Sequence, residues 1–419
     1  MAIETKDESA PVYLGRSARI VGPQQSPDPR EDPHAKTRRG DLGVPLQNFY
    51  FNRFMRDPLN RVGQSIPNND WKNVLTATMG RAPQGEVNPV KVPVSDPAVM
   101  TKHIKSVAQA IGADAVGVAP TIAEYVYQGG RRTEEEYRIE SAAETPEEIA
   151  RKFPYALCTL VAWPYEMNRA HRSPIGDASY HFGGNQRGQV VHQTLAGYIK
   201  ELGYEVRQGA INTMPMMILA GLGELGRNGL IISEKFGARV QPHVILTNMP
   251  LVPDKPVDLG VSDFCQICRK CAVSCPTNSI THGDKTIING VEKYAINWKT
   301  CYSLRPHMVQ FWHNCMTCVA SYPYTKPNVW WHSLTLRTLK SWPIPLRPWL
   351  VRTLIWIDDT IWGKIPRPRV KWLGYDTGRE PGQQGCTVAG CSCQKGEETS
   401  EVGFYPPLKE NARRFQAKG

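Results

Sequence analysis

The chain has 419 residues, of which 41% are apolar and 21% charged, a composition typical of a globular protein with two or three domains. Its net charge of +11 does not indicate nucleic-acid binding, because the 50 basic residues are scattered among 39 acidic ones. No apolar run approaches the roughly 18 to 20 residues that a membrane span needs, so we expect no span. The N-terminal residues MAIETKDESAPVYLGR lack an apolar signal core, which predicts a cytoplasmic protein. The alternative is an exported mature form without its leader, associated with the outer face of the cytoplasmic membrane.

The composition and hydrophobic pattern of the chain change near residue 100. Residues 1–99 are rich in Pro, Asn, Asp and Arg and predict an irregular, wrapping arm. The segment VMTKHIKSVAQAIGADAVGVAP then predicts a helix that stops at Gly112 and a strand at Ala115–Ala119. Further strands are predicted in PYALCTLVAWPY and ARVQPHVILTNMPL, and a helix in QVVHQTLAGYIKELGY. This alternation predicts an α/β (α+β) core over residues 100–260, followed by a cysteine-rich domain at 261–330 and a Trp/Pro-rich tail at 331–419.

The cysteines are placed as metal ligands rather than as disulfide partners. Seven of the eleven fall between Cys265 and Cys318, and the run CQICRKCAVSCP follows the bacterial ferredoxin pattern C-x2-C-x2-C-x3-CP. In a two-cluster ferredoxin the fourth cysteine of such a run ligates the other cluster. One 4Fe-4S cluster is therefore assigned to Cys275, Cys301, Cys315 and Cys318, and the other to Cys265, Cys268 and Cys271. A structural zinc site is the alternative.

An eighth cluster cysteine is missing from this pattern. Tyr322 stands before Pro323, where a ferredoxin has cysteine. We expect Tyr322 to pack beside a labile cluster with three cysteine ligands, which loses its unligated iron to become 3Fe-4S. Ligation by the Tyr322 phenolate is one alternative, and a ligand from the tail segment GCTVAGCSCQKG is the other; its candidates are Cys386, Cys391 and Cys393.

Two clusters indicate electron transfer, and the large α/β core favours an enzyme with a second cofactor over a simple electron carrier. Three stretches resemble the corrinoid-dependent reductive dehalogenases and, more distantly, the epoxyqueuosine reductases: AGLGELGRNGLIISEKFGARV, ILTNMPLVPDKPVDLGVSDFCQICRKCAVSCPTNSI and CMTCVASYPYTKPNVW. The resemblance implies a nitroreductase-like core that holds a base-off, cobalamin-type corrinoid, reduced through the two clusters, and the replacement of a carbon-bound halogen by hydrogen. No D-x-H-x-x-G run is present to ligate cobalt, which agrees with a base-off corrinoid.

The resemblance also implies partners and leaves alternatives open. An organohalide substrate is expected, together with an electron donor of the ferredoxin or flavodoxin type or a membrane anchor subunit, and no nucleic acid. A reductase of a modified nucleoside, of the epoxyqueuosine type, is the second enzyme hypothesis. An electron-transfer protein without a second cofactor is the third.

The candidate cofactor residues lie around a glycine motif. Glycines at this spacing let the backbone approach a large flat cofactor, and with the resemblance the set is Asn212, Gly221, Gly223, Gly226, Arg227 and Asn228, with Gly229 following. The G-x-G-x-x-G spacing also occurs in dinucleotide-binding proteins, but no acidic residue follows a strand about 20 positions on.

Reduction of R–X to R–H consumes two electrons and one proton, so an acid is required. The resemblance points to Tyr180 in GDASYHFGG, with Asp177 and His181 in reserve, although the tyrosine of the family stands about five residues later, where this chain has Asn185. A cation would stabilise the phenolate.

Gln241 stands where the family has arginine, so we expect Arg239, on the same strand face, to supply that charge, an ordinary exposed strand residue being the alternative. The tail tryptophans are expected either to line an apolar pocket or, more commonly, to lie in the core: Trp330, Trp331, Trp342, Trp349, Trp356, Trp362 and Trp372.

Overall fold

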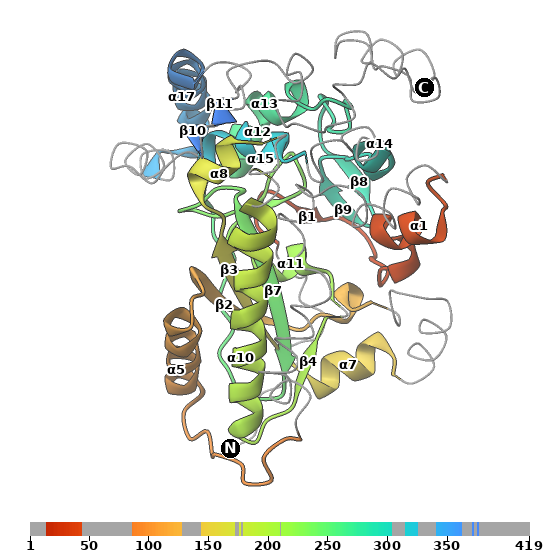
Figure 1. Ribbon diagram of the computed structural model, residues 1–419, viewed down its shortest axis with the longest axis vertical. Helices are drawn as coiled ribbons and strands as arrows, with labels where there is room; N and C mark the ends of the chain where they lie inside the picture. The colour runs from red at the N-terminus through yellow and green to blue at the C-terminus, as the bar shows by residue number, and fades with distance from the viewer. Residues whose placement is uncertain are drawn as a thin grey trace.

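The computed structural model describes residues 14–43, 86–127, 144–171, 176, 179–209, 211–303, 315–325, 341–362, 371–372 and 375–376. A four-stranded sheet in the order β2-β3-β7-β4 lies at its centre, with antiparallel pairing throughout (Figure 1). The strands are β2 (Ala115–Pro120), β3 (Tyr155–Ala162), β7 (Val240–Thr247) and β4 (Val206–Gln208). The architecture is thus the expected mixture of helix and sheet, and it is of the α+β kind.

Helices cover both faces of this sheet. On one face, α5 (Pro97–Ala110) and α10 (Arg187–Glu201) pack Ile104 and Leu195 against the buried side chains of Leu157 and Val161 in β3 (Figure 1). On the other face, α11 (Thr213–Leu219) packs its methionines against Cys158 and Leu160 of the same strand. Successive β3 side chains point to opposite faces, so this apolar run supplies both cores. The predicted strands β2, β3 and β7 and helices α5 and α10 are confirmed.

The cysteine-rich segment follows as short elements beyond one end of the sheet. They are α12 (Val261–Ile267), α13 (Lys270–Val273), β8 (Thr286–Ile288), β9 (Val291–Lys293), α14 (Trp298–Ser303), α15 (Thr317–Ala320) and η5 (Pro323–Thr325). The N-terminal strand β1 (Arg19–Ile20) pairs with β9 to complete a small sheet, β1-β9-β8. The segment before the core therefore lies beside the cysteine-rich segment (Figure 1).

The C-terminal helix α17 (Arg347–Trp362) packs along α12. Lys270, between two cluster cysteines, is buried and forms ion pairs with Asp358 and, at 2.6 Å, with Asp359 of α17. Trp349 and Trp356 of α17 are 65% and 67% exposed, so neither belongs to a core. The side chains of Trp330, Trp331, Trp362 and Trp372 lie outside the described residues.

The remaining elements are short. They are η1 (Pro29–Glu31), α1 (Pro33–Arg39), η2 (Ala123–Tyr125), α7 (Pro146–Lys152), α8 (Tyr165–Arg169), η3 (Ser179–Gln186), β5 (Glu224–Leu225), β6 (Ile231–Ile232), η6 (Ile344–Leu346), β10 (Lys371–Trp372) and β11 (Tyr375–Asp376). In the part of the chain that the structure describes, none of the helices combines the length and apolarity required to cross a bilayer.

Candidate functional site

The glycine motif between α11 and β6 is packed against its own chain. A Cβ on Gly221, at φ +69°, would lie 2.6 Å from the Lys255 carbonyl oxygen, and one on Gly223 would lie 2.3 Å from that of Ile232. A Cβ on Gly226 would meet the Asn228 side chain at 2.8 Å. Close packing within the chain therefore accounts for these glycines, and their role in cofactor binding stays a prediction.

Arg227 joins this motif to the cysteine-rich segment. Its side chain is 1% exposed and donates to the Cys265 carbonyl from Nε at 3.1 Å and from Nη2 at 2.6 Å. Nη1 donates to the carbonyls of Thr281 and Gly283, and the guanidinium lies 3.9 Å from the centroid of the Tyr294 ring. The backbone N–H of Arg227 also points to the Cys265 sulfur at 3.4 Å. Arg227 thus contacts a predicted cluster ligand.

The two candidate asparagines differ in their surroundings. Asn228 is buried, and its Oδ1 accepts the Leu230 N–H at 3.3 Å, while Nδ2 has no partner among the described residues. Asn212 precedes α11 and forms a 2.7 Å backbone bond to Tyr125, but its side chain does not cap the helix.

The seven cluster cysteines are free of disulfides. Burial raises the pKa of Cys268 to about 12. Burial also raises the pKa of Cys318, and further increases come from four neighbouring thiols: Cys301, Cys315, Cys271 and Cys275. Buried thiols with raised pKa values favour ionisation only beside a positive charge, which iron supplies.

Cys318 thus lies near thiols assigned to both clusters, and the division of the seven cysteines between two clusters stays a prediction. Within the described ranges, no group of three or more His, Cys, Asp or Glu side chains is arranged so that it could hold a metal ion. The chemistry of the sulfur donors nevertheless fits iron-sulfur clusters.

Tyr322 packs beside the three-cysteine group. Its ring is 2% exposed, and its hydroxyl lies 3.1 Å from the Cys265 sulfur. Burial raises the pKa of Tyr322, and the neighbouring Cys265 raises it further. Tyr322 thus packs beside Cys265 as expected, and ligation of iron by its phenolate stays an alternative. The alternative ligands Cys386, Cys391 and Cys393 lie outside the described residues.

Tyr180 and Arg239 meet at the same tryptophan. The Tyr180 ring packs edge-on against Trp163, with centroids 5.5 Å apart, and Arg239 Nη1 donates to the Trp163 carbonyl at 2.5 Å. Tyr180 belongs to the π-helical turn η3, a conformation often found at functional sites. Arg239 directly precedes β7 and is buried, so it is not an exposed strand residue, and burial lowers the pKa of its guanidinium. Asp177 and the His181 side chain lie outside the described residues.

Several buried polar atoms lie in η3, which packs against β3 and β7, or next to the ends of those strands. Among the atoms of the described residues that lack hydrogen-bond partners are Trp163 Nε1, Ser179 Oγ, Gln186 Nε2 and Arg239 Nε. An unsatisfied buried group costs about 1 to 3 kcal/mol, which a polar ligand would recover. This end of the sheet therefore fits a bound group with many polar substituents. Sequence reasoning missed Trp163, Ser179 and Gln186.

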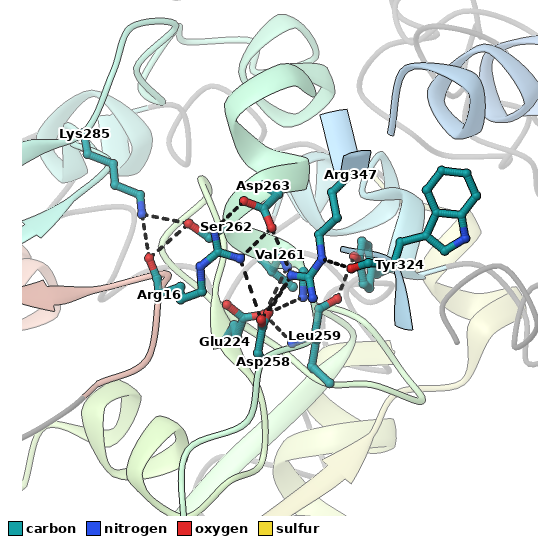
Figure 2. Close-up of polar contacts among 12 residues, drawn as sticks. Arg16, Glu224, Asp258, Leu259, Val261, Ser262, Asp263, Lys285, Tyr324 and Arg347 are labelled. Carbon is teal, nitrogen blue, oxygen red and sulfur yellow. Dashed lines mark hydrogen bonds and ion pairs between the residues drawn. The ribbon is translucent and has the colours of Figure 1, made fainter. Parts of the chain in front are cut away.

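Glu224, inside the glycine motif, is a further buried group that sequence reasoning missed. It is 0% exposed, and its Oε2 accepts the backbone N–H groups of Leu259 at 2.7 Å and Val261 at 3.0 Å. Figure 2 shows Glu224 beside an ion-pair network that joins Arg16 to Asp263 and Arg347 to Asp258. The signal for this residue in the sequence was a single acid among glycines and leucines in GLGELG.

Comparison with known proteins agrees with the resemblance read from the motifs. No family model matches the chain. The tetrachloroethene reductive dehalogenase of Sulfurospirillum multivorans is 28% identical over 296 residues, covering 64% of this chain and 57% of the relative. That of Desulfitobacterium hafniense is 27% identical over 285 residues, or 56% and 49% of the two chains. The epoxyqueuosine reductase of Lactococcus garvieae is 29% identical over 136 residues, or 29% and 36%.

Comparison with solved structures shows that the similarity extends to the fold. A catabolic reductive dehalogenase matches with a TM-score of 0.66 and 22% identity, covering 84% of this chain and 49% of that one. A second reductive dehalogenase, described for B12-dependent dehalogenation, matches with a TM-score of 0.65 and 21% identity, covering 88% and 54% of the two chains. The chain spans about half the length of the curated and solved proteins it matches. It is therefore a relative of the reductive dehalogenases in sequence and in fold, with the epoxyqueuosine reductases as more distant relatives.

Proposed function

We propose that this chain is a reductive dehalogenase, an oxidoreductase that replaces a carbon-bound halogen by hydrogen with a base-off corrinoid and two iron-sulfur clusters. One structural observation supports the proposal in addition to the similarity to known reductive dehalogenases. Trp163, Cys265, Cys268 and Tyr322 belong to a single buried cluster, and Tyr180 packs against it. The candidate proton donor and the candidate electron-carrying group thus share one apolar environment.

The reaction R–X + 2e⁻ + H⁺ → R–H + X⁻ assigns separate tasks to these groups. A bound corrinoid would supply the two electrons at the substrate carbon. Tyr180 donates the proton from its hydroxyl, and Arg239, held by the Trp163 carbonyl, offsets the negative charge that remains on the phenolate. The unpaired atoms of Ser179 and Gln186 would hold polar groups of the cofactor or substrate.

The proposal extends to organisation and partners. Residues 100–260 form the corrinoid-binding core, nitroreductase-like in type, and 261–330 form a ferredoxin-like cluster domain between the arm at 1–99 and the tail at 331–419. The substrate is an organohalide. The donor is a ferredoxin-type or flavodoxin-type protein or a membrane anchor subunit, and the location is the cytoplasm or, for an exported form, the outer face of the cytoplasmic membrane.

A second candidate is a corrinoid and iron-sulfur reductase of a modified nucleoside. The match to an epoxyqueuosine reductase over 136 residues favours it. That match covers 29% of the chain, against 64% for the dehalogenase of Sulfurospirillum multivorans, so we place this function second.

The test is anaerobic reconstitution with cobalamin, iron and sulfide, followed by desalting and measurement of cobalt, iron and the absorbance spectrum. We expect both cofactors to be retained, and halide to be released from tetrachloroethene or a bromophenol when titanium(III) citrate supplies electrons. Turnover of epoxyqueuosine without halide release would select the second candidate. Iron without retained corrinoid would favour an electron-transfer protein.

A further inference from the structure

Glu224 is a fully buried carboxyl group that the proposed reaction does not use. Carboxylates are rarely buried to this degree unless they are paired with a cation. Its Oε2 accepts two backbone N–H groups, whereas Oε1 has no partner among the described residues. Glu224 is thus anchored through one oxygen, and its other oxygen is left for a proton.

The charges around Glu224 largely cancel one another. The titratable and charged groups that face it from the packed elements are Arg16, Asp258, Asp263, Cys265, Lys285, Tyr324 and Arg347. Arg16 binds Asp263 through two bonds of 2.7 Å, and Arg347 lies 3.0 Å from both Asp258 and Asp263, so two cations offset two anions (Figure 2). Lys285 is committed to the Arg16 carbonyl and to Ser262.

The ionised form of Glu224 is consequently disfavoured. Burial, the largest effect, raises the pKa of Glu224, and Asp258 adds to the increase; the two backbone bonds and Arg16 oppose it, and the net pKa is about 7. A buried carboxyl group whose pKa is raised toward neutrality can take up or release a proton when the local charge changes.

Glu224 is linked to the three-cysteine group by structure and by charge. Val261, which it binds, lies in the same helix as Cys265. The Glu224 carboxylate contributes to the raised pKa of Cys265, so charge on one group is felt at the other. Three residues beyond Glu224, the Arg227 N–H points to the Cys265 sulfur.

We propose that Glu224 is the protonation site coupled to reduction of the cluster held by Cys265, Cys268 and Cys271. A bound cluster would supply one-electron transfer from a low-potential donor, and the Glu224 carboxylate would take one proton from solvent at Oε1. The charge of that proton would offset the charge of the added electron, so that the net charge of the buried region would stay unchanged. This inference rests on the clusters of the proposed function but on neither its corrinoid nor its substrate.

The test is an anaerobic redox titration of the full-length protein with its clusters, followed by paramagnetic resonance between pH 6 and pH 9. The relevant signal is the one that shifts in Tyr322→Phe, since Tyr322 contacts Cys265. Above pH 7, we expect the equilibrium constant for its reduction to fall up to tenfold per pH unit, which is about 59 mV for a one-electron couple. Glu224→Gln should remove this dependence, and Glu292→Gln, a partly exposed partner of Arg19, should retain it.

Each outcome separates the inference from the proposed function. A cluster signal with a pH-independent midpoint in the wild-type protein overturns the role of Glu224 and leaves the dehalogenase proposal intact, and this measurement needs no variant to fold. The same pH dependence in wild type and Glu224→Gln assigns the proton elsewhere. Absence of any iron-sulfur signal in the wild-type protein overturns both.

Discussion

Replacing Arg227 by methionine should weaken the junction between the glycine motif and the cysteine-rich segment. Methionine approximates the volume of the arginine stem but donates no hydrogen bond, so the carbonyls of Cys265, Thr281 and Gly283 lose their partner. Each buried carbonyl left unpaired costs about 1 to 3 kcal/mol, and loss of the contact with Tyr294 adds about 1 kcal/mol. Two effects reduce this cost, because water can hydrogen-bond the carbonyls near the surface and the substitution removes a buried charge. We therefore expect the free energy of unfolding to fall by about 4 kcal/mol.

The assay is thermal unfolding of the anaerobically purified protein, with iron counted on the same samples. At an unfolding entropy of about 2.1 cal/mol/K per residue, a chain of 419 residues shifts by about 1 °C per kcal/mol, so Arg227→Met should lower Tm by roughly 5 °C and should reduce the iron bound near Cys265. Arg19→Met is the matched control, because Arg19 forms one exposed ion pair, worth less than about 1 kcal/mol. Wild-type Tm and iron content in Arg227→Met would refute the reasoning.

Three further predictions concern the proton donor, the incomplete cluster and acid stability. Tyr180→Phe should keep its iron and corrinoid but turn over about 10²-fold more slowly, and unchanged turnover would exclude Tyr180 as the acid. Air-exposed wild-type protein should give a 3Fe-4S resonance that disappears in Tyr322→Cys; eight tightly held irons, whatever residue occupies position 322, would contradict this. Burial lowers the pKa of His192 to about 4 and of His243 to about 3, so the stability that each neutral ring contributes above its unfolded pKa of about 6.5 is lost as pH falls toward these values. At pH 5 each should cost about 2 kcal/mol, and denaturant unfolding of His192→Asn should lose correspondingly less stability between pH 7.5 and pH 5. An identical loss in the variant would assign the acid sensitivity to other groups.

The parts of the fold predicted from sequence are those with strong local patterns. The run in β3 is apolar at nearly every position because both of its faces are buried, and α5 and α10 each end near a glycine in the left-handed region, Gly112 and Gly203. The spacing of the cysteines likewise predicted that Tyr322 lies beside the three-cysteine group, and its hydroxyl contacts the Cys265 sulfur.

The parts that were missed depend on partners far away in the sequence. The pairing of β1 with β9 involves two residues on each strand, too few to leave a periodic pattern. Burial of Glu224 is fixed by backbone groups that follow it by more than thirty positions. The close contacts of Gly221 and Gly223 with Lys255 and Ile232, which could not be read from the sequence, require glycine, and the role of this motif in cofactor binding stays a prediction.

The docking of the N-terminal segment on the cysteine-rich segment has a consequence for biosynthesis. Arg16 and Asp263 are 247 positions apart, so the ribosome makes one long before the other. At about 5 to 20 residues per second, the interval is on the order of 10 to 50 s. During this interval the Arg16 segment has no surface on which to dock. Once α12 has been synthesised, one side of that helix stays accessible until the Arg16 segment docks on it. Iron and sulfide would reach the cysteines of the nascent chain while this side of α12 is accessible. Docking of the Arg16 segment afterwards would retain the metal.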